Sequence, residues 1–321
     1  MTPLLCADWG TTSLRVRLVD ADTEAVLAEM SNDSGVAQTY ASWMSGGGLR
    51  IPFFQHILAD SIRALGSSLE GVPLVLSGMA SSNIGLQELP YKELPFRADG
   101  ADLCTLGLEA SAAFPHSILL VSGVRALRDV MRGEETQLAG CPPVEGAHRF
   151  IFPGTHSKHV FVRDGLATGF QTYMTGEFFA LLSKHSLLAR SVEENTSAYP
   201  GAFALGVTDS IAGDILQNAF LVRTNQLFGR LSPVENYHYL SGLIIGSELK
   251  GLLLDETAVT IVGNAAQRTQ YLEAARVLGL RDVRSHDAAV AGVRGQCALF
   301  LLGLGLGLGL GPGPGLGLGG A

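Results

Sequence analysis

The sequence is poor in features that mark several large classes of protein. It has four cysteines and no C-x-x-C pair, so zinc and redox motifs are not indicated and buried thiols are expected. Lysine and arginine total 22 against 30 aspartates and glutamates, which gives a net charge of −8. Nucleic-acid-binding domains normally carry a basic stripe, so this balance argues against that class.

Long hydrophobic segments are also missing. No unbroken apolar run reaches about 18 residues, so we expect no membrane span. The first apolar run starts within four residues of Met1, which leaves no room for a signal peptide. We therefore expect a cytoplasmic protein that holds any anionic ligand with a few local cations and with backbone amides.

The length of 321 residues favours two domains, and 47% hydrophobic residues are enough for two cores. Prolines and glycines at 141–148 indicate a boundary. We predict an N-terminal domain over residues 1–140 and a C-terminal domain over residues 147–302. Residues 303–321 alternate glycine and leucine and read as a low-complexity tail without defined structure.

Near the N-terminus, two apolar runs flank a turn rich in glycine, threonine and serine. The second run alternates apolar residues with Arg15 and Arg17, the period of a half-buried strand, so a β-hairpin is predicted. Glycine at the tip lets the backbone approach an anion, and Asp8 can hold a hydrated Mg²⁺. An ordinary turn would use the same residue types. The candidate phosphate contacts are Gly10, Thr11, Thr12, Ser13 and Arg15.

Residues 149–162 repeat this plan of strand, Gly-Thr-x-Ser turn and strand. The repeat suggests two similar domains that each contribute a turn to one nucleotide. Lys158 is expected either against the β- or γ-phosphate or as an exposed strand residue. His156 and His159 have poor spacing for a metal site. The candidates here are Gly154, Thr155, His156, Ser157 and Lys158.

Other segments give a coarse secondary structure. We predict helices over 53–65 and near 211–221, and strands over 73–77, 117–123 and 258–263. A helix is predicted to begin near residue 175, with Thr175 or Gly176 as its cap. Residues 239–254 predict an apolar helix whose Gly242, Gly246 and Gly251 let it pack closely against a sheet or a nucleotide.

The turns at residues 8–12 and 153–158 together resemble those of the actin-like ATPase and sugar kinase superfamily, and within it the 2-dehydro-3-deoxygalactonokinase family. Residues 78–85, 129–138, 174–177 and 240–246 match the same family. The resemblance covers nearly the whole chain. It implies an α/β fold of two actin-like (ribonuclease H-like) domains, each a mixed sheet flanked by helices, with a cleft between them.

The resemblance implies phosphorylation of 2-dehydro-3-deoxy-D-galactonate at its 6-hydroxyl, with ATP and Mg²⁺ as cofactors and Asp8 organising the metal. It also puts Glu134 or Glu135 in the role of general base, and we favour Glu134 because it directly follows Gly133. A carboxylate suits that role because a primary hydroxyl is a poor nucleophile until its proton is accepted. Acidic residues in a first helical turn also simply complement the helix dipole.

Substrate contacts follow from the same resemblance. The loop at 78–85 comes directly after a strand, where ligands collect in open α/β sheets, although an ordinary polar loop would look similar. The candidate sugar-acid contacts are Gly78, Ser81, Ser82, Asn83, Tyr91, Lys92, Arg132, Thr175 and Glu177. Gly263 and Asn264 are candidates for the adenosine side, although a plain connection between strand and helix would also fit.

Several alternatives stay open at this point. The chain could phosphorylate another sugar acid such as 2-dehydro-3-deoxygluconate, or transfer phosphate to water. A non-catalytic sugar-sensing protein on the same fold is a further alternative, but such proteins usually carry a DNA-binding extension and none precedes residue 4. The expected partner is a small-molecule sugar acid rather than nucleic acid or membrane. The oligomeric state is not set by the sequence, and a homodimer is one option.

Overall fold

The computed structural model describes residues 1–66, 68–195, 197–255, 257–305 and 307. Contacts divide the chain into two compact units. The first unit contains Met1–Pro143, Gly165–Gly169 and the chain from Ala289 onward. The second contains Val144–Asp164 and Phe170–Ala288. The C-terminal helix, which the sequence placed with the second domain, therefore packs with the first unit.

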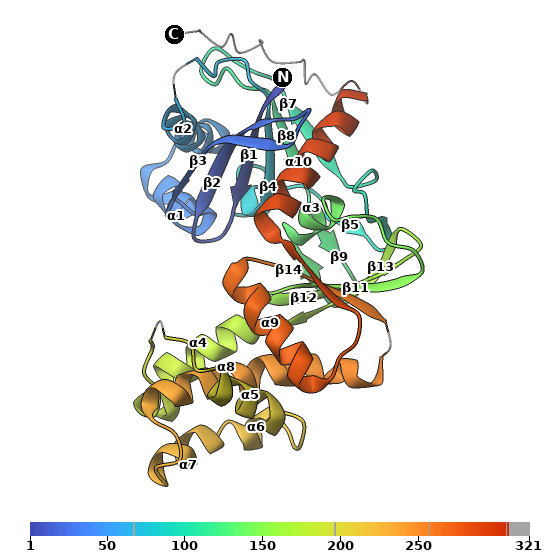
Figure 1. Cartoon of the computed structure of the whole chain (residues 1–321). Helices are drawn as coiled ribbons and strands as arrows, with labels where there is room; N and C mark the ends of the chain where they lie inside the picture. Colours follow the sequence, from blue (N-terminus) through green and yellow to red (C-terminus); the bar gives the residue numbers. More distant parts are fainter. Residues whose placement is uncertain (67, 196, 256, 306, 308–321) are drawn as a thin grey trace, which may run out of the picture. The chain divides into compact units, whose positions relative to one another are not determined.

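The first unit is built on a six-stranded mixed sheet (Figure 1). Strand β1 pairs antiparallel with β2 and parallel with β4, and β4 is parallel to β8. The predicted hairpin is confirmed, with Trp9 opposite Leu14. In order across the sheet, the strands are β3 (Ala25–Asn32), β2 (Leu14–Asp20), β1 (Pro3–Trp9), β4 (Leu74–Gly78), β8 (Ile118–Val121) and β7 (Thr105–Leu108).

Alternation along β1 assigns its side chains to two faces. Trp9 packs in the core with Phe54 of helix α2, their rings 5.3 Å apart. The opposite face meets α10, where the Gln296 amide donates to the carbonyl of Ala7 over 2.8 Å. Helices of this unit are α1 (Val36–Gly46), α2 (Arg50–Arg63), α3 (Glu134–Ala139) and α10 (Ala288–Gly305). Smaller elements are the 3₁₀ turn η1 (Met79–Ser81) and a sheet of β5 (Lys92–Glu93), β9 (Val124–Arg125) and β10 (Val130–Met131).

Helices α3 and α10 approach each other through glycines. A Cβ atom at Gly140 would lie 1.9 Å from the carbonyl oxygen of Ala291, and one at Gly295 would lie 1.8 Å from that of Thr136. Both distances are far shorter than any van der Waals contact, so the two backbones touch directly. The position of α3 is thereby tied to α10.

Helix α10 is long and apolar enough to cross a membrane by length and composition, with a mean hydropathy of 1.5, but 44% of it is buried in the protein. The expected tail begins later than predicted, because Gly303 and Gly305 still belong to this helix. The rest of that prediction falls at 306 and 308–321, outside the described residues.

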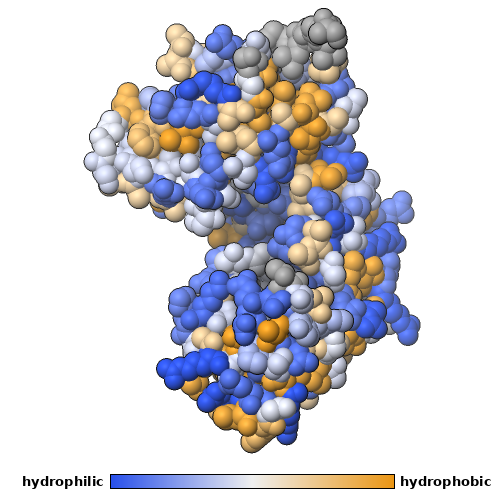
Figure 2. All heavy atoms as spheres, turned by 60° about the vertical axis from the view of Figure 1, so that its left-hand side comes forward, coloured by the Kyte–Doolittle hydropathy of each residue, from blue (hydrophilic) through white to orange (hydrophobic). Residues whose placement is uncertain are grey.

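On the face shown in Figure 2, hydrophobic residues are scattered among hydrophilic ones.

The second unit repeats the strand order of the first. Its strands β13, β12, β11, β14 and β15 follow one another as β3, β2, β1, β4 and β8 do. Strand β11 pairs antiparallel with β12 and parallel with β14, which is parallel to β15. This duplication is the actin-like arrangement that the resemblance implied. The strands are β11 (Ala147–Phe152), β12 (Ser157–Arg163), β13 (Leu166–Tyr173), β14 (Ala258–Gly263) and β15 (Val283–Asp287). The start of β13, up to Gly169, is grouped with the first unit together with β6 (Phe96–Arg97), with which it pairs.

The helices of the second unit are α4 (Thr175–His185), α5 (Pro200–Asp209), α6 (Ile215–Asn218), α7 (Leu221–Leu227), α8 (Pro233–Leu249) and α9 (Ala265–Leu278), with the 3₁₀ turns η2 (Leu187–Arg190) and η3 (Lys250–Leu254). The prediction of one helix near 211–221 is wrong, because a turn precedes α6 and a second short helix follows. Helix α4 begins at Thr175, close to the predicted start, but its N-cap is Met174 rather than Thr175 or Gly176.

The glycines of α8 serve a different contact from the one predicted. A Cβ at Gly242 would lie 2.0 Å from the carbonyl oxygen of Phe203, and one at Gly206 would lie 2.1 Å from that of Tyr239. These residues join α5 to α8, so the close packing is between two helices rather than against a sheet or a ligand. Gly251 falls beyond α8, in η3.

Candidate active site

The first turn, residues 10–13, joins β1 to β2. The amide of Gly10 donates to the carbonyl of Ser13 over 2.9 Å, which closes it. The first amides of α1 hold its other side, because Val36 N–H donates to Gly10 and Ala37 N–H donates to Thr11. Gly35 packs so closely that a Cβ there would lie 2.3 Å from the carbonyl oxygen of Thr11. Thr11, Thr12 and Ser13 are exposed.

Three chain segments meet beside Asp8. Gly78 ends β4 with φ = +82°, and a Cβ there would lie 2.8 Å from the carbonyl oxygen of Trp9 and 3.0 Å from Asp8 Oδ1. A Cβ at Gly133 would in turn lie 3.8 Å from the Cα of Gly78. The carboxylate of Asp8 and the N-terminus of α3 therefore adjoin the same glycine. The sequence assigned both to the reaction centre, and the first unit brings them together.

The Asp8 carboxyl is partly exposed at the end of β1. Burial raises its pKa above the ordinary value, while the charges of Arg15 and Arg17 act in the opposite direction. Among the described residues, no three His, Cys, Asp or Glu side chains form a metal cage. A lone carboxylate still suits Mg²⁺, which usually takes one or two carboxylates and completes its shell with water and phosphate oxygens.

The two candidate bases at the start of α3 have different surroundings. Glu135 is fully buried, and both of its carboxylate oxygens lie 2.8 Å from the amide of Gly133. Burial and the neighbouring Glu134 raise the pKa of Glu135 to about 7. Glu134 is partly exposed and accepts from the amide of Arg132 over 3.0 Å. In this structure Glu134 is the carboxylate that an outside hydroxyl can reach.

Three of the predicted sugar-acid residues form one cluster. The guanidinium of Arg132 donates to the hydroxyl of Ser81 and lies 4.4 Å from the ring centre of Tyr91. Gly123 is wedged among them, since a Cβ there would lie 3.1 Å from Tyr91 and 3.2 Å from the Cβ of Arg132. Arg132 is only two residues from Glu134. The cluster thus places a cation beside the start of α3.

Other predicted sugar-acid residues are turned elsewhere. Lys92 pairs with Asp102 over 2.9 Å, and the hydroxyl of Ser82 donates to the carbonyl of Met79 over 2.7 Å. The carbonyl of Asn83 accepts from Arg50. The contacts of Ser82 and Asn83 stabilise the loop at 78–85, and the Lys92 ammonium and the Ser82 hydroxyl, which the sequence analysis assigned to a ligand, have partners within the protein.

The second turn, residues 153–156, joins β11 to β12. A Cβ at Gly176 would lie 2.6 Å from the carbonyl oxygen of Gly154, so the start of α4 packs directly on this turn. The amide of Glu177 donates to the carbonyl of Thr155 over 3.1 Å, and its carboxylate pairs with His156. Both turns are therefore held by the N-terminus of the helix that follows their third strand.

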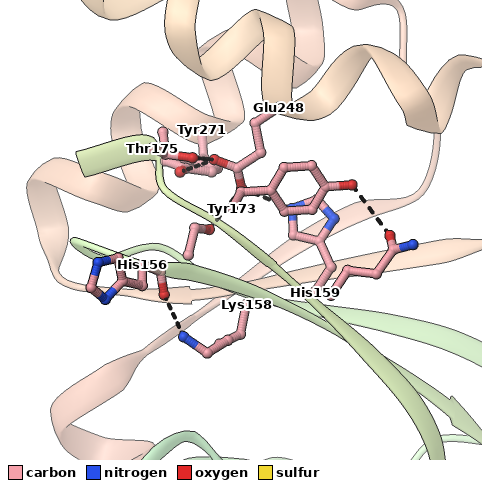
Figure 3. Close-up of polar contacts among 9 residues, drawn as sticks. His156, Lys158, His159, Tyr173, Thr175, Glu248 and Tyr271 are labelled. Carbon is pink, nitrogen blue, oxygen red and sulfur yellow. Dashed lines mark hydrogen bonds and ion pairs between the residues drawn. The ribbon is translucent and has the colours of Figure 1, made fainter. Parts of the chain in front are cut away.

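Side chains that the sequence offered to phosphate point inward at the second turn. Lys158 is 6% exposed, and its ammonium donates to the carbonyl of His156 over 2.9 Å (Figure 3). It is therefore not the exposed strand residue of the second interpretation. Ser157 is fully buried and its hydroxyl donates to Glu248. Thr175, which the sequence analysis assigned to the sugar acid, is 8% exposed and also donates to Glu248. The groups that remain outward at this turn are Gly154, Thr155 and His156.

Glu248 is a residue that the sequence analysis missed. It lies near the end of α8, beneath the second turn, and also accepts from His159 and Tyr271 (Figure 3). The ring of His159 stacks on Tyr173 with 4.5 Å between centres. The available signal was an acidic residue in an otherwise apolar run, because such residues are seldom buried without partners.

A pocket of about 360 Å³ opens beside the second turn within the second unit. Asn264 caps α9. The side-chain amide of Gln267 donates to the carbonyl of Pro153 over 3.0 Å, which ties α9 to the turn. Asn264 itself is engaged in a reciprocal capping box with Gln267. The lining includes residues from the turn and from α4, α8 and α9, among them Gly154, Thr155, Thr175, Phe179, Ser241 and Tyr271.

Comparison with known proteins identifies relatives along nearly the whole chain. A probable 2-dehydro-3-deoxygalactonokinase of Rhizobium meliloti is 33% identical over 298 residues, covering 88% of this chain and 91% of the relative. The 2-dehydro-3-deoxygalactonokinase of Escherichia coli is 29% identical over 304 residues, covering 90% of this chain and 96% of the relative.

A solved structure from Sinorhizobium meliloti assigned to the same enzyme superposes with a TM-score of 0.79. It is 31% identical, with 92% of this chain and 95% of that chain covered. The model of the 2-keto-3-deoxy-galactonokinase family matches residues 8–299, which span both turns and the start of α3. The chain therefore belongs to the 2-keto-3-deoxy-galactonokinase family.

Proposed function

We propose that this chain transfers the γ-phosphoryl group of Mg-ATP to the 6-hydroxyl of 2-dehydro-3-deoxy-D-galactonate. The products are ADP and 2-dehydro-3-deoxy-6-phosphogalactonate. Family membership supports the reaction, and one observation carries its assignment to residues. Asp8 and the Glu134 end of α3 adjoin the same glycine, Gly78, so a metal ligand and a proton acceptor are held side by side.

The roles follow from the chemistry of phosphoryl transfer. The transition state is loose, so positioning and charge stabilisation supply most of the rate. Asp8 would hold Mg²⁺, which neutralises charge on the phosphates when bound. Glu134 accepts the proton of the attacking hydroxyl, because it is partly exposed whereas Glu135 is fully buried.

Arg132 is the cation that we assign to the substrate carboxylate. Its guanidinium has a neutral hydroxyl and an aromatic ring as neighbours, whereas Lys92 is paired with Asp102. A planar guanidinium binds a carboxylate through two parallel hydrogen bonds. Ser81 and Tyr91 hold the guanidinium in place, so a sugar acid is favoured over a neutral sugar.

The second turn and the pocket beside it are the parts of the site that we assign to the nucleotide. We propose that the main chain of the second turn contacts the phosphates and that the pocket of about 360 Å³ receives the adenosine, next to Gly154 and Thr155. The first turn stays a candidate phosphate contact. Gly263 and Asn264 then contribute indirectly, because they lead into α9. The capping box of α9 holds Gln267 against Pro153.

The test of this proposal is Glu134→Gln, which keeps the size of the side chain and removes its basicity. We expect turnover with the sugar acid to fall roughly 10²–10⁴-fold. Exposed Glu109 in the same unit provides the control, since Glu109→Gln should leave turnover unchanged. If Glu134→Gln kept the turnover of the parent protein, Glu134 would not be the general base.

Substrate choice is tested by following ADP release with a panel of acceptors. The proposal expects ADP release with 2-dehydro-3-deoxygalactonate, and slower release with its gluconate epimer and with hexoses. ADP release without any sugar acid would favour transfer to water. We further propose a cytoplasmic location and keep a homodimer as a prediction, which light scattering of the purified protein can test.

A further inference from the structure

Glu248 is surrounded by hydrogen-bond donors inside the second unit. Its side chain is 1% exposed. Ser157 and His159 donate to Oε1 over 2.7 and 2.8 Å. Thr175 and Tyr271 donate to Oε2, the latter over 2.7 Å. Two donors on each oxygen account for the roughly four acceptor sites of an ionised carboxylate.

This arrangement favours a carboxylate over a neutral polar group of similar size. Burial alone would favour the neutral acid, but the hydrogen bond and charge of His159 and the hydrogen bonds from Thr175 and Ser157 outweigh it, so the pKa of Glu248 lies below its ordinary value. An amide in its place has one acceptor oxygen and one NH₂ donor. The hydroxyls on one side would then have to turn and accept from the NH₂ group, and the stronger hydrogen bonds to an ionised acceptor would be lost.

The donors come from the elements that form the second turn and its surroundings. Ser157 is the first residue of β12, directly after the turn. Thr175 is the first residue of α4, and the next two residues pack on the turn and bond to it. Tyr271 belongs to α9, whose Gln267 holds the carbonyl of Pro153. One carboxylate therefore connects the exit of the turn to both helices that border it.

We propose that Glu248 is a positioning residue for the nucleotide. It fixes the second turn, the N-terminus of α4 and the Tyr271 side of the pocket relative to one another, so that backbone amides meet the phosphates in one geometry. This inference rests on the proposed function, because it assigns the second turn to the phosphates of ATP. Glu248 itself does not touch the nucleotide.

A purely structural role would lower stability and leave nucleotide affinity unchanged. The deciding measurement is the dissociation constant of Mg-ADP, obtained by calorimetry on the full chain, because it needs no turnover. We expect Glu248→Gln to weaken Mg-ADP binding at least about 10-fold, or about 1.4 kcal/mol. The KM for the sugar acid should change far less than the KM for ATP.

Matched variants separate positioning from folding. Thr175→Val removes one donor from the network and should weaken Mg-ADP binding in the same direction, whereas Thr175→Ser should recover most of that loss. Glu235→Gln lies on the same helix, in its N-terminal capping box, and should leave Mg-ADP binding unchanged. If Glu248→Gln does not fold, Ser157→Ala carries the test, because Ser157 donates to the same carboxylate and is fully buried.

The outcomes distinguish this inference from the function on which it rests. If the parent protein phosphorylates the sugar acid and folded Glu248→Gln binds Mg-ADP as tightly, the positioning role is overturned while the kinase stands. A lower melting temperature with unchanged affinity also overturns it. If the parent protein neither binds Mg-ADP nor releases ADP with any sugar acid, the proposed function itself fails.

Discussion

The two turns share a backbone plan and differ in what lies beneath them. Each closes a hairpin, accepts amides from the following helix and has a glycine, Gly35 or Gly176, pressed against it. Beneath the first turn, Trp9 and Phe54 form an apolar core. Beneath the second lies the carboxylate of Glu248. The duplicated topology thus keeps its main-chain contacts while the supporting side chains differ in kind.

The difference extends to the groups that each turn presents. Thr11, Thr12 and Ser13 are exposed at the first turn, whereas Ser157 and Lys158 are buried at the second. The first turn can therefore offer side-chain donors to an anion. The second presents fewer side-chain donors, those of Thr155 and His156, so it depends more on its main chain and on how firmly that main chain is held.

The strongest test of this comparison is to add a methyl group that forces each turn away from its helix. A methyl group at Gly35 would lie 2.3 Å from the carbonyl oxygen of Thr11, and one at Gly176 would lie 2.6 Å from that of Gly154. A shift of about 1 Å at a reacting group can cost 10²-fold, so we expect Gly35→Ala and Gly176→Ala each to lose at least that much kcat/KM.

Gly292 of α10 is the control for these substitutions, because a Cβ there meets nothing within 4 Å. Gly292→Ala should retain activity and raise the free energy of unfolding by about 0.5–1 kcal/mol. If either turn variant kept the activity of Gly292→Ala, the contact of that turn with its helix would have no part in the reaction.

A second prediction concerns the metal, which we assign to the first turn. Removing the carboxylate in Asp8→Ala should lower turnover about 10²-fold or more at moderate Mg²⁺, because charge stabilisation is lost. Excess Mg²⁺ should restore part of the rate. The measurement is turnover against Mg²⁺ concentration, with exposed Asp33→Ala as the control. The metal role is wrong if Asp8→Ala keeps the Mg²⁺ dependence of the parent protein.

The pKa of Glu135 gives a prediction on stability. Its pKa of about 7 in the folded protein exceeds the ordinary 4.5, so the folded state binds the proton more tightly. The resulting stabilisation is present below pH 4.5 and is lost as pH rises through 7. The loss amounts to roughly 3 kcal/mol, at about 1.36 kcal/mol per unit.

Glu135→Gln cannot ionise, so its free energy of unfolding should rise relative to the parent protein between pH 5 and pH 8. Urea unfolding of both proteins at the two pH values measures this difference, with Glu109→Gln as the exposed control. Equal differences at the two pH values would show that Glu135 titrates as an ordinary carboxyl.

The smallest expected effect concerns the second turn alone. Gln267→Ala removes one side of the α9 capping box and the hydrogen bond to Pro153, which should cost about 1 kcal/mol in the free energy of unfolding and raise the KM for ATP a few-fold. Ser232→Ala damages the corresponding box of α8, which does not touch the turn. It should match the stability loss without the change in KM.

Local sequence patterns predicted the elements that carry the site. Alternation around Arg15 indicated the first hairpin, and Gly133 marked the start of α3, where φ is +110°. The family resemblance identified the chain, and the comparisons bear it out. Each local pattern involves only neighbouring residues in the sequence, so it could be recognised without knowing the fold.

The side chains that hold the second turn in place could not be predicted from local patterns. The partners of Glu248 that precede it, Ser157, His159 and Thr175, lie 73 to 91 residues away in the sequence. A single acidic residue in an apolar run indicates a buried charge but not which donors surround it. For the same reason, the glycines of α8 could be recognised as close-packing residues while their partner, α5, could not.

The glycine contacts between α3 and α10 limit how this enzyme can change its preference for acceptors. With Gly140 and Gly295 in backbone contact with α10 and α3, the helix that carries Glu134 has no room to slide toward a shorter molecule or away from a longer one. With the substrate site that we propose, adaptation to a sugar acid of another length would therefore come from the segments around Ser81 and Tyr91. Mutational libraries for new acceptors are best directed there, with both glycines left untouched.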